Sequence, residues 1–135
     1  TEIRIFEKDF RIDAPVTRLK IELMLARATE SEGLLVEDRL AILEQARELA
    51  ATGTTRHPTS SGVFAAYCKV GVAILRHGGD RAVFDDAMDR LIKASERLAD
   101  PEMSSLIRHF ERLEANILSE IGPDQIEAEL VGELD

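Results

Sequence analysis

The sequence predicts an all-α fold: a compact bundle of about five helices around one central apolar helix, with an N-terminal arm and a short acidic C-terminal helix or tail. Apolar residues make up 44% of the 135 residues, which is enough for one compact core. Aromatic residues make up 4%, and there are 4 Pro and 8 Gly, so the chain lacks the aromatic and turn residues of an all-β sandwich. We divide the chain into an arm (1–13), a single helical domain (14–122) and an acidic tail (123–135).

The arm has two interpretations. Ile3 and Ile5 alternate as they would in a strand, whereas Ile3, Phe6 and Phe10 recur as they would in a helix. The sequence leaves its conformation open, and we expect the arm to pack on the core.

The first helix is predicted over about 15–31. Asp13 and Pro15 are residues that typically begin a helix, and Gly33 gives it a stop. The apolar residues that share one face are Val16, Leu19, Leu23 and Ala26, with Ile21 and Leu25 widening it. We expect this face to enter the core.

The second helix is predicted over about 36–52, with Gly53 ending it. Its apolar stripe consists of Val36, Leu40, Leu43 and Ala46. The segment GTTRHPTSS (53–61) follows, contains no apolar residue, and is predicted to be the longest loop of the chain. Ser60 or Ser61 then caps the next helix.

The third helix, about 62–77, has almost no polar face. A helix that is apolar on all sides is surrounded by others, so we place it at the centre of the fold. Small side chains predict a close approach of neighbouring backbones at Ala65, Ala66, Gly71 and Ala73. Cys68 is the only cysteine and is predicted to be a buried small hydrophobe, which suits a reducing, cytoplasmic location.

Two further helices follow a tight turn at His77-Gly78-Gly79-Asp80, where Asp80 is expected to cap the fourth helix. That helix, about 81–99, places Phe84, Ala87, Met88, Leu91, Ser95 and Leu98 on one stripe. Its surface carries two acid-first pairs, Asp86/Arg90 and Asp89/Lys93. Asp100-Pro101 begins the fifth helix, whose apolar residues are Met103, Leu106, Ile107, Phe110, Leu113, Ile117 and Ile121. Gly122-Pro123 ends it.

Part of the chain has a family resemblance. The run from Gly71 to Asp80, followed by Asp86-Ala87 and Ala94, resembles a degenerate tetratricopeptide repeat over about residues 71–101. It departs from the family at residues 81–84, which lengthen the turn or second helix, and in the small residues early in the first helix. The resemblance implies a scaffold that holds a partner's peptide or helix in a concave groove. Helices of about 17–20 residues favour a closed bundle instead.

Charge limits the partners. There are 17 Lys and Arg against 26 Asp and Glu, a formal net charge of −9, so the field of the protein repels phosphate backbones and anionic lipid surfaces. We therefore expect no nucleic acid and no membrane as partner, and the acidity favours a basic protein.

No motif for chemistry emerges. The three histidines are His57, His77 and His109, and no two have the spacing that places two ligands on one helix face, so no metal site or cofactor is predicted. Neither a phosphate-binding glycine loop nor a nucleophile elbow is present, and we predict no catalytic residue.

One polar constellation is a candidate site. Arg56, His57, Ser60 and Ser61 precede the N-terminus of the central helix, where free N–H groups and the helix dipole favour an anion. The alternative is a capped, solvated loop, since Ser and Thr are good caps.

The leading interpretation is a non-enzymatic protein–protein interaction module, acting as an adaptor, chaperone-like or regulatory domain. Its expected contacts are apolar residues of the arm and of the tail: Ile3, Phe6, Phe10, Ile126, Leu130 and Leu134. Two alternatives stay open: a helical sensor that binds a small anionic ligand near the 53–61 loop, and a self-assembling homodimer.

Overall fold

Five helices account for nearly all of the residues that the computed structural model describes, which are 2–77 and 80–121. They are α1 (Glu2–Glu30), α2 (Val36–Arg56), α3 (Ser61–Arg76), α4 (Ala82–Leu98) and α5 (Pro101–Ile121). Side chains are described for 14–77 and 80–119, and no strand occurs within the described ranges. The predicted all-α fold is confirmed, while the acidic tail (123–135) lies outside the described residues.

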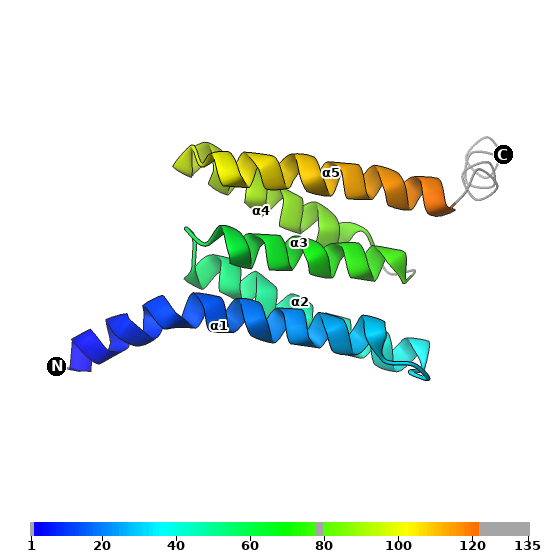
Figure 1. The fold of residues 1–135 in the computed structure, drawn as a ribbon, viewed down its shortest axis with the longest axis horizontal. Coiled ribbons are helices and arrows are strands. Elements are labelled where there is room, and N and C mark those ends of the chain that lie inside the picture. Colours follow the sequence, from blue (N-terminus) through cyan, green and yellow to red (C-terminus); the bar gives the residue numbers. More distant parts are fainter. Residues whose placement is uncertain (1, 78–79, 122–135) are drawn as a thin grey trace.

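The helices form two layers (Figure 1). In one layer α1, α3 and α5 run in the same direction, and in the other α2 and α4 return behind them. α3 packs against all four other helices, which confirms its predicted central place. Within the described residues α1 and α5 do not pack on each other, so α3 separates them.

The core is centred on α3, whose side chains are buried from Val63 to Cys68 and from Val70 to Ile74. Cys68 is buried, as predicted. The expected close approach of backbones occurs at Gly71, where an added Cβ would lie 2.6 Å from the Cα of Phe84 in α4. Only glycine permits α3 and α4 to pack this closely, because any side chain at position 71 would meet backbone atoms.

The start of the first helix differs from the prediction. α1 runs without interruption from Glu2, so the prediction that a helix begins at Asp13–Pro15 is wrong. Pro15 lies inside α1, where a proline removes one backbone hydrogen bond and commonly bends the helix. Figure 1 shows the N-terminal part of α1 set at an angle to the rest of the helix. The side chains of the arm lie outside those that are described.

The core face of α1 also differs from the prediction. Val16, Leu19 and Leu23 are 38%, 55% and 61% exposed, so they do not enter the core. The buried residues of α1 are Thr17, Ile21 and Ala28, so Ile21 is buried as predicted, and Leu25 packs partly buried against the core. α1 carries apolar residues on two faces, and helical spacing alone does not tell which of them is covered.

The predicted loop at 53–61 is shorter in the structure. α2 continues through Arg56, so Gly53 does not end it and only residues 57–60 connect α2 to α3. Gly53 is buried, and a Cβ there would lie 3.0 Å from Val63 Cγ1 and 3.1 Å from Thr17 Cγ2. This glycine serves close packing rather than helix termination. Ser60 is the N-cap of α3, as predicted, and its Oγ accepts a hydrogen bond from the Val63 N–H at 3.3 Å.

The last two helices agree with the sequence. The predicted core residues of α4 are buried from Phe84 to Ser95, although Leu98 is exposed, and α5 buries Met103, Phe110 and Ile117. Asp100 caps the start of α5 through a 2.9 Å bond from the Glu102 N–H to its Oδ1.

Candidate functional site

α1 presents an apolar surface to solvent, which we call the outer stripe: Val16, Leu19 and Leu23. Spacings of three and four residues place these side chains on one face of the helix. Among the described residues α1 packs only against α2 and α3, through the face that holds Ile21. Val16 and Leu23 are exposed outside that face, while Leu19 also lines a cleft of about 410 Å³ with Ser60 and Gly62 at the start of α3. Single exposed apolar residues are normal on a protein surface, whereas a continuous row of them is typical of an interaction site.

Two cations border one side of the outer stripe. Lys20 follows Val16 by one turn, Arg27 follows Leu23 by one turn, and both are exposed. On the other side Glu22 binds Lys69 at 3.2 Å and Arg18 at 3.3 Å. Burial acts to raise the pKa of Glu22, but the two cations outweigh it and hold that pKa below its usual range. Because Glu22 is bound by two cations, the other charges near the stripe are Lys20, Arg27 and the exposed Glu30, which follows Leu23 by two turns on the same face.

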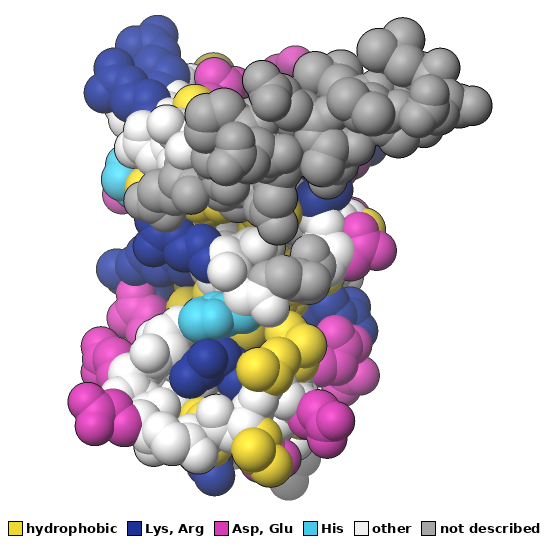
Figure 2. All heavy atoms as spheres, turned by 90° about the vertical axis from the view of Figure 1, so that its right-hand side faces the viewer, with side chains coloured by type: hydrophobic (Ala, Val, Ile, Leu, Met, Phe, Trp, Pro, Cys, Tyr) yellow, Lys and Arg dark blue, Asp and Glu magenta, His cyan; other side chains and the backbone are white. Residues whose placement is uncertain are grey.

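A groove of about 520 Å³ lies over α3, with residues of α1 and α5 on its sides. Its basic residues are Lys69, Arg76 and His77. Figure 2 looks onto the end where α1, α3 and α5 finish, and shows Lys and Arg side chains and a histidine at mid-height. Burial lowers the pKa of His77, and the nearby Arg39 and Arg76 lower it further. The apolar lining residues Val72, Ala73 and Phe110 are buried, whereas Leu25 and Leu113 are partly buried.

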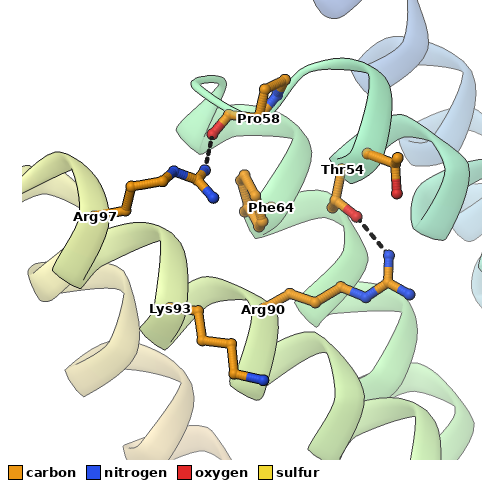
Figure 3. A pocket seen from close by; sticks show the side chains of 7 residues that line it. Thr54, Pro58, Phe64, Arg90, Lys93 and Arg97 are labelled. Atoms are coloured by element: carbon orange, nitrogen blue, oxygen red, sulfur yellow. Dashed lines mark hydrogen bonds between the residues drawn. The ribbon is translucent and has the colours of Figure 1, made fainter.

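A second cleft, the basic cleft, lies between the end of α2 and the C-terminal half of α4 (Figure 3). It has a volume of about 380 Å³ and is lined by Thr54, Thr55, Pro58, Phe64, Arg90, Lys93 and Arg97. Figure 3 shows Arg90 and Arg97 reaching from α4 toward Thr54 and Pro58, with Phe64 between them. Arg90 and Arg97 therefore contact the end of α2 and the segment that connects it to α3, whereas the ammonium of Lys93 points away from them and pairs with Asp89.

The predicted anion-binding residues are placed differently. His57 is buried and caps the C-terminus of α2, while Arg56 is exposed in the last turn of that helix. Ser60 is engaged as the N-cap of α3, and Ser61 is the first residue of that helix. None of the four lines the basic cleft. Sequence reasoning assigned Arg90 and Lys93 to surface ion pairs and gave no role to Arg97, although the spacing of residues 90, 93 and 97 puts them on one face.

A partly exposed polar cluster around Tyr67 links α2, α3 and α4. The Tyr67 hydroxyl donates to Asp86 Oδ2 at 2.5 Å, and the Arg90 guanidinium lies 5.5 Å from the centre of the Tyr67 ring. Arg90 also donates to the Ala51 carbonyl at 3.0 Å and to Thr54 Oγ1 at 2.9 Å, linking α4 to α2. Burial, and then Asp86, raise the pKa of Tyr67, which makes the phenol a poor acid near neutral pH.

The described residues also offer no reactive thiol and no cluster of metal ligands. Burial raises the pKa of the Cys68 thiol to about 12, so little thiolate forms near neutral pH. Among the described side chains, no three of His, Cys, Asp and Glu come together as a metal site would require. None of the helices in the described part of the chain has the length and apolar character needed to cross a membrane.

Comparisons with protein-family models, with curated proteins and with solved structures find no match to this chain. The predicted partner-binding residues of the arm and of the tail lie outside the described side chains, so those assignments stay predictions.

Proposed function

We propose that this protein is a non-enzymatic interaction module that binds an amphipathic helix of a protein partner along the outer stripe. The observation that carries the proposal is the exposure of Leu19 and Leu23, at 55% and 61%, on a helix whose opposite face is buried. Fully burying a leucine side chain stabilises a complex by about 1.5–3 kcal/mol relative to leaving it exposed. A partner that covers both leucines gains a substantial part of that.

The position of α1 supports the proposal. α1 is the end helix of the α1/α3/α5 layer, and it contacts no helix on its outer side within the described residues. Arrays of helical hairpins need a polar outer face on their terminal unit to stay soluble, whereas the outer face of α1 is apolar. A helix of a partner would supply the missing neighbour, in keeping with the scaffold role that the tetratricopeptide resemblance implies.

Local charge selects the chemistry of the partner. In a pair of helices that meet along an apolar seam, the charged residues beside the seam set the choice of partner. Lys20 and Arg27 lie beside the stripe and Glu30 lies beyond its last leucine, so the favoured helix carries acidic side chains opposite Lys20 and Arg27. The formal net charge of −9 favours a basic partner over the whole surface. Screening confines charge effects to about 8 Å at physiological salt, so Lys20 and Arg27 beside the stripe outweigh the net charge of the whole protein.

A synthetic peptide tests the proposal on the full chain. The probe is a four-heptad helix with Leu along its seam and Glu beside it, and the comparison peptide has Lys in place of each Glu. We expect the acidic peptide to bind, the Lys peptide to bind at least about tenfold more weakly, and Leu23→Ser to weaken the acidic peptide by at least about tenfold. Leu118→Ser, at an exposed apolar position of α5, is the matched control and is expected to change nothing.

Two results would contradict the proposal. The first is equal binding of both peptides, because the cations would then play no part. The second is an equal loss of affinity in Leu118→Ser and Leu23→Ser, because the outer stripe would then have no special role.

Self-association through the outer stripe is the second candidate, because the same exposed row can face itself in a second copy. Charge disfavours it, since Lys20 and Arg27 face copies of themselves when the two helices are antiparallel. When the helices are parallel the acid opposite them is Glu22, which is already bound by Lys69 and Arg18. Light scattering across protein concentration distinguishes the candidates: a concentration-dependent dimer that Leu23→Ser abolishes would favour self-association.

The cytoplasm is the proposed location. The one cysteine of the chain is a buried free thiol, which suits a reducing compartment.

A further inference from the structure

The basic cleft brings together three cations that the proposed interaction does not use. Arg90, Lys93 and Arg97 lie on one face of α4, and the cleft that they line measures about 380 Å³. This volume lies at the lower end of the range of about 300–1,000 Å³ that small-molecule sites occupy. Its size therefore suits a compact ligand rather than a folded partner.

The three cations differ in how they are held. Arg90 is bound to the Ala51 carbonyl, to Thr54 Oγ1 and to Asp86 Oδ2, so its guanidinium is fixed in place. Lys93 forms a 2.9 Å pair with Asp89 on the surface, where its side chain is 70% exposed. Arg97 donates to the Pro58 carbonyl at 2.8 Å, and no carboxylate among the described residues lies within ion-pair distance of it. Arg97 and Lys93 are the cations that an incoming ligand can engage.

The geometry points to a phosphate group. Lys93 and Arg97 are one helical turn apart, about 6 Å along the axis. Figure 3 shows the Lys93 ammonium pointing away from Arg97, so a single tetrahedral anion contacts both only when the exposed Lys93 side chain leaves Asp89 and turns toward Arg97. A guanidinium has five N–H donors in a fixed fork, and the bond to Pro58 uses one of them. The remaining fork matches phosphate oxygens, and a lysine ammonium adds a compact positive charge.

We propose that the basic cleft binds a small phosphorylated molecule, with its phosphate held by Lys93 and Arg97 and its organic part against Pro58 and Phe64. Arg90 then acts as a positioning residue, because it ties α4 to the end of α2 and keeps the walls of the cleft in register. Asp89 competes with the ligand for Lys93, so the site prefers a dianion over a monoanion. The formal net charge of −9 does not exclude phosphate binding in the cleft, because carboxylates more than about 8 Å away are screened by salt.

Titration with inorganic pyrophosphate tests the site on the full chain, followed by amide chemical shifts at low ionic strength. We expect saturable shifts confined to residues near 58–64 and 93–97, with Kd of about 1 mM or below. Lys93→Gln and Arg97→Gln are each expected to weaken binding by about tenfold. Arg108→Gln, at an exposed arginine of α5 that does not line the cleft, is the matched control and should leave Kd unchanged.

Three results would overturn the proposal. Shifts that do not saturate by about 10 mM show that no site exists. An equal loss in Arg108→Gln and Lys93→Gln shows a general charge effect rather than a cleft. A phosphoserine peptide that binds much more tightly than pyrophosphate, through the same residues, shows that the ligand is a modified protein and not a small molecule.

Discussion

Gly71→Ala tests the packing of the central helix most directly. Its Cβ would lie 2.6 Å from Phe84 Cα and 2.9 Å from Phe84 N. Ordinary contacts between carbon atoms are about 3.5–4.0 Å. Both opposing atoms belong to the backbone of α4, so no rotamer change relieves the clash. The two helices would have to separate by about 1 Å, with a loss of the dispersion contacts around that point.

Two opposing effects, overpacking and helix propensity, set the change in the free energy of unfolding that Gly71→Ala causes. Overpacking of a core typically costs about 1–3 kcal/mol, and a backbone contact belongs at the upper end of that range. Alanine is a better helix former than glycine, and this difference stabilises the variant by about 1 kcal/mol in the interior of a helix. The expected net effect of Gly71→Ala is therefore a loss of about 2 kcal/mol in the free energy of unfolding.

Urea unfolding followed by circular dichroism measures this difference, with Gly53→Ala as the control. At Gly53 the new Cβ would meet two methyl groups at 3.0 and 3.1 Å, on Val63 and Thr17, which can shift slightly. Overpacking and helix propensity then nearly cancel, and we expect a change of less than about 1 kcal/mol. A Gly71→Ala protein as stable as the wild type would refute the close approach of α3 and α4, as would equal effects of the two substitutions.

Three further predictions concern stability. Ala99 ends α4 with a φ of 50°, a left-handed conformation that is costly for a residue with a side chain. Ala99→Gly should therefore raise the free energy of unfolding, measured by urea titration, by about 1 kcal/mol. No gain in stability would mean that this conformation is not strained. Ser60→Ala removes the N-cap bond to Val63 and should lower the thermal midpoint, corresponding to about 1 kcal/mol, whereas Ser105→Ala at an exposed site in α5 should not. His77 has a pKa lowered from 6.5, so it contributes stability above pH 6.5 that is lost as the pH falls through its folded-state pKa. His77→Gln should therefore make the decline in urea midpoint between about pH 7 and pH 5 shallower, and an unchanged slope would contradict this reasoning.

The candidate site shows what helical spacing can and cannot predict. The stripe of α4 was predicted correctly from Phe84 to Ser95, because that helix has one apolar face and its opposite face is charged. α1 has apolar residues on two faces, and the face with Val16 and Leu23 was assigned to the core by mistake. Periodicity measures how apolar residues are grouped around a helix. It does not say which group a neighbouring helix covers.

Glycine was ambiguous for a similar reason. Gly53 follows a helical pattern and precedes polar residues, which is also how a helix terminus looks in sequence. The structure uses it instead where α2 approaches Val63 and Thr17, and α2 continues for another turn. A glycine that permits close packing and a glycine that ends a helix differ only in what lies beside them, and those neighbours are distant in sequence.

The sequence by itself determined the all-α fold class and the central place of α3, narrowed the cap of α3 to Ser60 or Ser61, and placed the start of α5 at Asp100-Pro101, because these depend on composition and on residues within a few positions of one another. Only the tertiary structure decided which face of α1 is covered, and only it placed Arg97 beside Pro58 to complete the basic cleft. Both features join side chains to segments far away in the chain. Their arrangement follows from how α1 and α4 pack against α2 and α3, and local patterns carry no record of that packing.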